Sequence, residues 1–381
     1  MRKGFQTRKF FCRMQMQFIG FCTLLLLAPT DVAKDSFIAP AAAARGQLSA
    51  QDVSQLQSQA ESGDPAAQLK LARAYARGDG VSKDAEKAAA WYKKAAEQGN
   101  SDAQNSLGGL YLVGEGVERD KQEAVKWFHK AARQGNTSAM FSLGAAYYNG
   151  DGVKVDDSLS FAWFTLAKEV GNPAAAEAIQ RAESELKPRK ITEGFKRIAE
   201  MYERGEHLPA NQTEAARWWM NAAARGDEDA QIATALKFFN GQGVPQDFSQ
   251  GRHWCNEAIK QGDARGEYCM GYIYQRGLGV TRDLKEARKR YELASKAGHV
   301  SAIRALAQME TAGEGGKVDR RAACVLYARI ANAGDKDALL SLAKLRKEIG
   351  AKEWKEVEKQ MTLYHIDRAK LEYGLQQVDT P

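Results

Sequence analysis

The chain has few of the residues from which metal centres and catalytic sites are built. Its 381 residues include only five histidines, and these are scattered, none with a second ligand at metal spacing. The histidines are His129, His207, His253, His299 and His365. The sequence also has no nucleophile elbow and no isolated phosphate-binding loop. We therefore expect a protein that is not an enzyme, with no catalytic residues, no cofactor and no metal.

A long apolar run is also missing. The apolar stretch Phe18–Ala28 has eleven residues, whereas a membrane-spanning helix needs about 20. Five basic residues precede this stretch, and small residues suited to cleavage follow it at 39–44. This arrangement is typical of a secretory signal peptide. We predict a signal peptide at 1–44, a periplasmic or secreted location, and no stable membrane span after cleavage. An uncleaved segment would instead tether a cytoplasmic protein to the membrane.

Concentrated basic charge is the third feature that the chain lacks. The formal net charge is +7 at pH 7, but six of the Lys and Arg residues lie within 1–44. No run of Lys and Arg with interleaved aromatic residues follows that segment. Because nucleic-acid-binding surfaces gather basic residues on one face, we expect no nucleic-acid partner.

Glycine, by contrast, is abundant and regularly spaced. In two runs a glycine recurs every 36 residues, and Asp or Asn follows it in seven of the eight cases. The first run is Gly63, Gly99, Gly135 and Gly171, and the second is Gly226, Gly262, Gly298 and Gly334. Such a glycine can end one helix in the left-handed conformation, and the Asp or Asn can cap the next helix. A period of this length is the signature of a solenoid.

Each period predicts two helices, A and B, whose positions are counted here from the glycine as zero. Helix A carries small residues at positions 4 and 9 and usually an aromatic residue at position 12, for example Ala103, Gly108 and Tyr111. A Gly-x-Gly-Val loop follows in most periods, and Asp or Asn at position 21 would cap helix B. Helix B carries a bulky pair at positions 28 and 29, such as Trp127–Phe128. Because these features recur with the period, we interpret them as turns and packing rather than a phosphate cradle or a sugar-stacking platform.

The pattern of residues across Ala103–Asn136 resembles the Sel-one-like repeat (SLR). This family consists of α/α solenoids related to tetratricopeptide repeats. The resemblance covers about residues 63–350. It implies an all-α, right-handed superhelical solenoid of seven 36-residue helix-turn-helix repeats, with an inserted capping helix and a C-terminal cap. Repeats four and seven depart from the pattern, because His207 replaces the second loop glycine, and Glu310 and Leu326 replace the usual Tyr and Trp.

The period breaks between Gly171 and Gly226, which lie 55 residues apart. An extra Ala/Glu-rich helix fits there and would stop before Pro188, because proline disfavours helix at the residue before it. The resemblance implies that this helix is a cap. The predicted organisation is a signal peptide at 1–44, a linker or lead-in helix at 45–62, repeats one to three with the cap at 63–189, repeats four to seven and the start of an eighth at 190–350, and a C-terminal capping helix and tail at 351–381, loose beyond about 370.

A binding surface can be predicted from the positions that do not repeat. Positions 10, 13 and 14 of helix A vary freely, and the resemblance implies that the A helices line the concave side. We predict that a protein or peptide partner binds there, with ordinary solvent-exposed surface as the alternative for any one residue. The candidate residues are Arg73, Arg77, Tyr148, Asn149, Glu200, Arg204, Phe239, Asn240, Tyr272 and Arg276.

Three cysteines lie beyond residue 44: Cys255, Cys269 and Cys324. Cys255 comes seven residues before Gly262, and Cys269 comes seven residues after it. Two antiparallel helices joined at that glycine would place the two thiols at similar height, within reach of a disulfide in an oxidising compartment. Alternatively, Cys255 is a small buried hydrophobic residue in a slot that is otherwise aromatic.

Three hypotheses for function follow. The leading one is a non-enzymatic exported scaffold or adaptor, because the resemblance implies mostly binding or adaptor proteins. The second is a cell-envelope enzyme or activator acting on peptidoglycan or a polysaccharide. The third is a membrane-tethered signalling regulator, which applies if the N-terminal segment stays attached.

Overall fold

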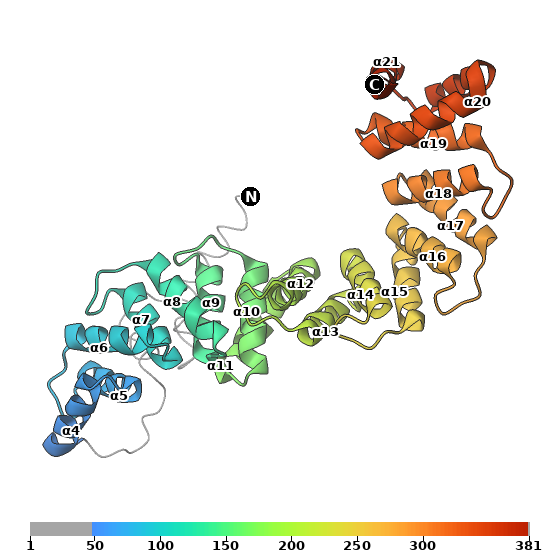
Figure 1. Ribbon diagram of the computed structural model, residues 1–381. Coiled ribbons are helices and arrows are strands. Elements are labelled where there is room, and N and C mark those ends of the chain that lie inside the picture. Colours follow the sequence, from blue (N-terminus) through green and yellow to red (C-terminus); the bar gives the residue numbers. More distant parts are fainter. Residues whose placement is uncertain (1–47, 380–381) are drawn as a thin grey trace. The chain divides into compact units, whose positions relative to one another are not determined.

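A computed structural model of the protein describes residues 48–379, with side chains described as far as 376. This part of the chain is all-α and contains no strand (Figure 1). The chain divides into two compact units, Met1–Trp218 and Trp219–Pro381, and each is described by itself. The predicted signal peptide and the first residues of the predicted linker lie outside the described residues.

The first unit contains the A and B helices of repeats one to three, preceded by one helix and followed by two. Its helices are α4 (Ala50–Glu61), α5 (Pro65–Arg77), α6 (Ala85–Glu97), α7 (Ser101–Val113), α8 (Lys121–Arg133), α9 (Thr137–Asn149), α10 (Asp157–Glu169), α11 (Pro173–Glu185) and α12 (Pro188–Arg204). The next helix, α13 (Gln212–Ala223), crosses the boundary between the two units.

The second unit continues the alternation of A and B helices and closes with two further helices. Its helices are α14 (Glu228–Asn240), α15 (Phe248–Lys260), α16 (Ala264–Arg276), α17 (Leu284–Lys296), α18 (Val300–Ala312), α19 (Arg320–Asn332), α20 (Lys336–Leu363) and α21 (Arg368–Asp379).

Capping residues set the ends of the helices, as repeat two shows. The side chain of Asn100 accepts a hydrogen bond from the backbone N–H of Ala103 at the start of α7, and Gly114 ends that helix at φ 78°. Asp120 then caps α8, and its own backbone N–H donates to the carbonyl of Tyr111 at 2.9 Å. This last bond closes the loop between helices A and B.

The second loop glycine is required by a close approach between neighbouring repeats. A Cβ atom on Gly116 would lie 2.0 Å from the carbonyl oxygen of Ala85, the first residue of α6. Gly152 lies in the same way against Lys121 at the start of α8. Any side chain at these positions would push the loop away from the preceding repeat.

Inside a repeat, the ring at position 29 of helix B lies on the small residue at position 9 of helix A. The ring of Phe128 covers Gly108, and the ring of Phe164 covers Gly144 in the next repeat. Both rings are buried. The missing side chain on helix A therefore makes the hole that the aromatic residue of helix B fills.

Paired glutamine side chains join one repeat to the next, which the sequence analysis did not foresee. Gln104 donates from Nε2 to the carbonyl of Ala96 at 3.0 Å, across the junction of repeats one and two. Its Oε1 accepts a hydrogen bond of 2.8 Å from Gln134 Nε2. The same bonds are made by Gln68 with Gln98 and by Gln231 with Gln261.

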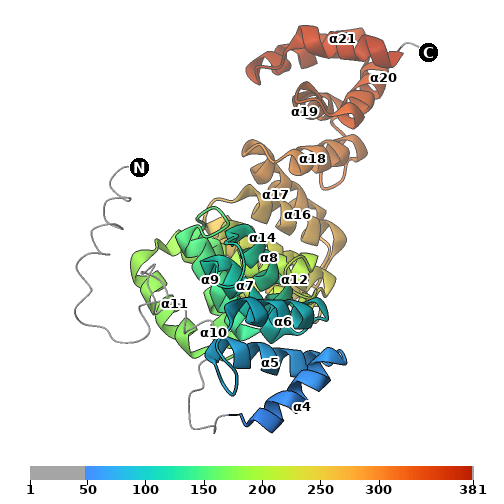
Figure 2. The same cartoon turned by 90° about the vertical axis from the view of Figure 1, so that its left-hand side faces the viewer.

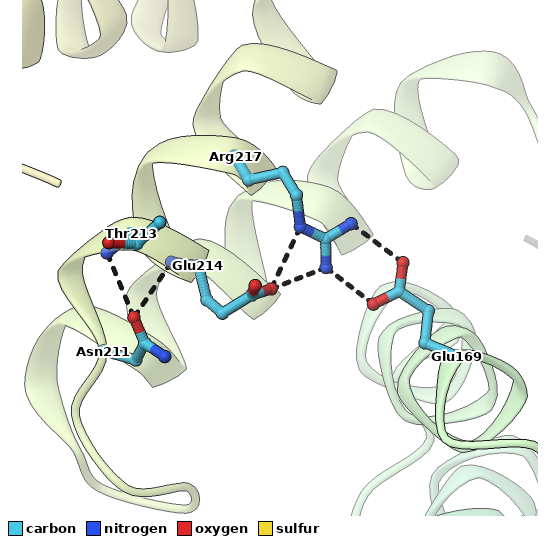
Figure 3. Close-up of polar contacts among 5 residues, drawn as sticks. All are labelled: Glu169, Asn211, Thr213, Glu214 and Arg217. Atoms are coloured by element: carbon cyan, nitrogen blue, oxygen red, sulfur yellow. Dashed lines mark hydrogen bonds and ion pairs between the residues drawn. The ribbon is translucent and has the colours of Figure 1, made fainter. Parts of the chain in front are cut away.

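The break in the period is occupied by α11, and both α11 and α12 pack on α10 (Figures 1 and 2). Arg217 then connects α13 to α10, because its guanidinium binds both carboxylate oxygens of Glu169, at 2.9 and 2.6 Å, and also binds Glu214 (Figure 3). These carboxylates raise the pKa of Arg217. Helix α12 runs through residues 189 and 190, where the sequence analysis placed a domain boundary, and the compact units divide later, within α13.

The C-terminal segment is helical further than expected. Helix α20 is interrupted at Gly350, whose φ of 76° is not helical. The segment beyond residue 370, expected to be a loose tail, forms most of α21, which extends to Asp379. Leu371 and Leu375 of that helix are buried in the terminal core with Trp354. Burial of these apolar side chains explains why the segment is ordered as a helix.

Candidate partner-binding surface

The described residues 48–379 offer neither a membrane span nor a metal site. Over that range no helix is both long and apolar enough to cross a bilayer. The same range contains no group of three or more potential metal-ligating His, Cys, Asp or Glu residues.

Arg73 and Arg77 extend from the last two turns of α5. Arg73 forms an ion pair of 3.1 Å with Asp102 on α7, in the next repeat. Asp102 also accepts a hydrogen bond of 2.9 Å from Asn136, which caps the third repeat. Arg73 is therefore the first member of a polar chain across three repeats, while Arg77 is exposed at the C-terminal end of its helix.

The remaining candidates of the first unit lie on α9 and α12. The Tyr148 hydroxyl lies 3.3 Å from a carboxylate oxygen of Glu185 on α11, and Asn149 donates to Asp151 in its own loop at 3.3 Å. Glu200 is 3.7 Å from Arg197 one turn earlier on the same helix. Arg204 is exposed in the last turn of α12, where its positive charge interacts favourably with the negative end of the helix dipole.

Phe239 does not belong to the exposed surface on which the spacing placed it. Its ring packs into repeat five, where a Cβ atom on Gly251 would lie 2.1 Å from the ring. Phe248 stacks on the same ring with centroids 6.4 Å apart. Repeat five therefore reverses the usual packing, because helix A supplies the ring and helix B supplies the missing side chain.

The other candidates of the second unit form an exposed strip on α14 and α16. Tyr272 is 44% exposed, and the Arg276 guanidinium lies 5.8 Å from the centre of its ring. Leu236 occupies the same position of the preceding A helix and is 45% exposed, although the sequence analysis missed it. Asn240 is exposed one turn further along α14. We call Leu236, Asn240, Tyr272 and Arg276 the Tyr272 strip.

An ion pair between the same two helices supports this strip. Arg265 on α16 binds Asp229 on α14 at 2.7 Å and also binds Asp263, which caps α16, at 2.6 Å. The two carboxylates raise the pKa of Arg265. The A helices that carry the Tyr272 strip are thereby linked by side chains of their first turns.

Two of the scattered histidines meet, although no spacing predicted it. His207 stacks on His129 of α8 with ring centroids 4.6 Å apart, and both lie beside Trp163. Burial, together with the charge of His207, lowers the pKa of His129 from 6.5 to about 4. Burial also lowers the pKa of His207. Both rings are therefore neutral near pH 7 and serve as packing.

A hollow of about 600 Å³ lies between the loop before α19 and the middle of α20 in the second unit. Its charged side chains are Arg288, Lys317, Asp319, Arg320, Arg321, Glu348 and Glu353. Arg320 binds Glu348 at 3.1 Å, and Arg288 binds Glu310 next to the hollow. Since the cations and carboxylates nearly balance, this hollow does not present a field of one sign to a ligand.

Comparison with known proteins identifies the repeats. The family model described as Sel1 repeat matches seven segments, 65–100, 101–136, 137–172, 197–227, 229–263, 264–299 and 300–335. The matched segments leave out α11, the inserted helix. A comparison with curated proteins finds no match.

Solved structures similar to this chain include two at about 30% identity. A protective antigen of uropathogenic Escherichia coli that displays an SLR fold is 30% identical, with a TM-score of 0.41, and the match covers 85% of this chain and 73% of that one. A Sel1 repeat protein from Oxalobacter formigenes is 29% identical, with a TM-score of 0.39, over 78% of this chain and 80% of that one.

Proposed function

Because the chain belongs to the Sel1 repeat family, whose solenoids generally mediate protein–protein interaction without catalysis, we propose that it is a non-enzymatic scaffold or adaptor. It binds a protein or peptide partner through exposed side chains of its A helices. Recognition is non-covalent, on a surface that is already formed in the free protein. The solenoid supplies the frame, and the residues that differ between repeats supply specificity.

The observation that carries this proposal is the Tyr272 strip. An aromatic residue and an arginine side by side are the side chains most often found at the energetic centre of protein interfaces. Leu236 adds an exposed apolar side chain on the neighbouring A helix. In the first unit, by contrast, Arg73, Tyr148 and Glu200 are already engaged with side chains of the protein itself.

The regular helical backbone of the strip is a second reason to place the interface there. The ion pair between Asp229 and Arg265 joins α14 to α16, and the side chains of Asp227 and Asp263 cap the N-termini of these two helices. A preformed surface loses little conformational entropy when a partner binds, so more of the contact free energy appears as affinity.

The test is capture of partners by the full chain, followed by measurement of affinity. Extract from the cell envelope is passed over immobilised wild type, over the double variant Tyr272→Ala, Arg276→Glu, and over Tyr373→Ala. Tyr373 is a matched control because it is an exposed tyrosine of the same unit, on α21. We expect a partner that wild type and Y373A retain, with Kd weakened at least tenfold by the double variant. Equal binding to all three proteins would contradict this placement of the site.

We also propose that the protein is exported, to the periplasm or beyond. The support is the composition of residues 1–44, with basic residues, a short apolar stretch and small residues in that order. The N-terminus of the mature protein tests this proposal. A start near residues 42–45 supports export, whereas an intact Met1 contradicts it and favours a membrane-tethered cytoplasmic regulator.

A further inference from the structure

Cys255 occupies a place in its repeat that belongs to an aromatic side chain elsewhere. Position 29 of helix B holds an aromatic residue in the six other repeats, namely Tyr92, Phe128, Phe164, Trp219, Tyr291 and Tyr327. In repeat five the interior is filled from the opposite side, because the ring of Phe239 lies on Gly251. The Cys255 side chain at position 29 is smaller than an aromatic ring and therefore leaves space for helix A of the next repeat.

The next repeat approaches that thiol closely. A Cβ atom on Gly266 of α16 would lie 2.6 Å from the carbonyl oxygen of Cys255, so the backbones of α15 and α16 almost touch there. Cys269 follows Gly266 by three residues and so lies on the same face of α16, one turn further along. Close helix approach is what a disulfide needs, since its Cα atoms are usually separated by about 4.4–6.8 Å.

The two thiols are free and lie in the same buried apolar cluster, together with Met270 and Ile273. The neighbouring Cys255 thiol lowers the pKa of Cys269, and the neighbouring Cys269 thiol together with burial raises the pKa of Cys255. Cys269 is also the more accessible of the two, at 8% exposed against 0%.

We propose that Cys255 and Cys269 form a disulfide that joins helix B of repeat five to helix A of repeat six when the protein folds in the presence of a small-molecule disulfide. The Cys269 thiolate attacks the oxidant, for example oxidised glutathione, and releases one glutathione thiolate. The Cys255 thiolate then attacks the Cys269 sulfur of the mixed disulfide and releases the second. The two cysteines lose two protons and two electrons, and the oxidant gains them as two thiols.

Cys324 provides an internal control. It is also fully buried, on α19, and burial raises its pKa to about 12. It is a free thiol with the same low accessibility as Cys255. If burial alone decided whether a thiol forms a disulfide, Cys324 and Cys255 would behave alike. Only the neighbouring Cys269 distinguishes Cys255 from Cys324.

Peptide mapping tests the proposal on the full chain. The protein is refolded in glutathione buffer that is either oxidising or reducing, then alkylated in denaturant and digested with trypsin. Cleavage after Arg252, Lys260, Arg265 and Arg276 separates the peptides 253–260 and 266–276. We expect these two peptides to be joined only in the oxidised sample, with a mass about two hydrogens below their sum, while 322–329 carries alkylated Cys324.

Two variants keep the result interpretable. Cys324→Ser should leave the link intact, and Cys269→Ser should abolish it. Circular dichroism checks that each variant is folded, and the oxidised wild type should unfold at a higher urea concentration than the reduced protein, a difference that C269S removes. Recovery of both peptides separately and alkylated from the oxidised, folded wild type would overturn the proposal, and so would a link from either cysteine to Cys324.

Discussion

Repeats one and two of the first unit and repeats six and seven of the second share their backbone pattern but join their neighbours by different chemistry. In repeats one and two the contacts at position 5 of helix A are made by neutral amides, with Gln104 bound to Ala96 and Gln134. In repeat six Glu267 stands where Gln104 stands and pairs with Arg290 of its own repeat at 3.0 Å. Position 5 of helix A therefore makes a polar contact in repeats one, two and six, and the residue that occupies it decides whether that contact is charged.

The contrast is sharpest between repeats six and seven. Glu310 replaces the usual aromatic residue at position 12 of helix A and is only 5% exposed. Its carboxylate binds Arg288 on α17, and burial raises the pKa of Glu310 despite that partner. Burial of the Glu310 carboxylate carries a desolvation cost that its ion pair must overcome, whereas a buried amide pair must only satisfy its hydrogen bonds.

The largest effect should come from breaking this ion pair. Glu310→Ala removes the buried carboxylate that faces Arg288 and leaves the arginine only its pair with Glu292 at 3.2 Å, so we expect a loss of about 3 kcal/mol in the free energy of unfolding. Urea unfolding of the full chain measures it. The double variant Arg288→Ala, Glu310→Tyr recreates the pair Ala89 and Tyr111 of the first unit and should recover most of the loss. A small effect of the single variant would mean that the pair is solvated and the contrast between the units is weaker than we infer.

Acid should affect the first unit through its histidine pair. The pKa of His129 is lowered to about 4 in the folded state, against 6.5 ordinarily. The contribution of neutral His129 to the free energy of unfolding is thus fully present above pH 6.5 and is lost as the pH falls toward 4. The first-unit unfolding transition should lose about 2–3 kcal/mol between pH 7 and pH 4, as followed by urea melts.

The groups around the pair define the control for this pH dependence. His207 and Trp163 lie against the His129 ring, and Glu206 and Arg133 carry the nearby charges. His129→Phe keeps an aromatic ring in place but removes the proton site, so its stability should depend less on pH. If wild type and H129F lose stability equally, another group is responsible.

Removing one amide of the first unit should have a smaller effect than removing the carboxylate of Glu310. Gln104→Ala removes the hydrogen bond to the Ala96 carbonyl, which still accepts from the Gly99 N–H, and leaves Gln134 Nε2 without its acceptor, so we expect a loss of about 1–2 kcal/mol in the free energy of unfolding. Repeat three carries Met140 and Val170 at the equivalent positions. The double variant Gln104→Met, Gln134→Val should therefore be less destabilised than the single variant. Thermal melts that show the reverse order would contradict a structural role for the amide pair.

The smallest effect should be the same in both units. Asp120 caps α8 with hydrogen bonds of 2.9 Å from the N–H groups of Gln122 and Glu123, and Asp283 caps α17 with equivalent bonds of 3.0 Å. Asp120→Ala and Asp283→Ala should each cost about 1 kcal/mol in urea melts. A large difference between the two would show that the units differ in their scaffold and not only in their junctions.

The sequence predicted those features that recur with the period. The caps at Asp120 and Asp283 and the turn that begins at Gly114 follow from local backbone requirements, whereas the close approach of Gly116 to the preceding repeat was not predicted. The glutamine pairs were also within reach, because Gln68 with Gln98, Gln104 with Gln134 and Gln231 with Gln261 recur together at fixed positions. This recurrence was visible in the sequence, but an analysis of helical periodicity assigns every polar residue, including a buried glutamine, to the solvent-exposed face.

Features that depend on tertiary packing could not be predicted in this way. Phe239 was placed on the surface because position 13 varies, and only its ring lying on Gly251 shows that repeat five packs in reverse. The His129–His207 contact depends on how α12 meets α10 after the inserted α11, which no period describes. Three of the ten candidates, Asn240, Tyr272 and Arg276, are exposed on the same two A helices as the exposed Leu236, and exposure is set by neighbours rather than by spacing.

The most direct test of the central proposal, that the Tyr272 strip binds a partner, is photo-crosslinking. A benzophenone amino acid is introduced in place of Tyr272 or, in a separate protein, in place of Tyr373, and each full chain is irradiated in envelope extract. Our account predicts a discrete crosslinked partner from position 272, competed by unlabelled wild type but not by the variant Tyr272→Ala, Arg276→Glu, and no such product from position 373. Crosslinking from position 373 alone, or equal competition by both competitors, would contradict it.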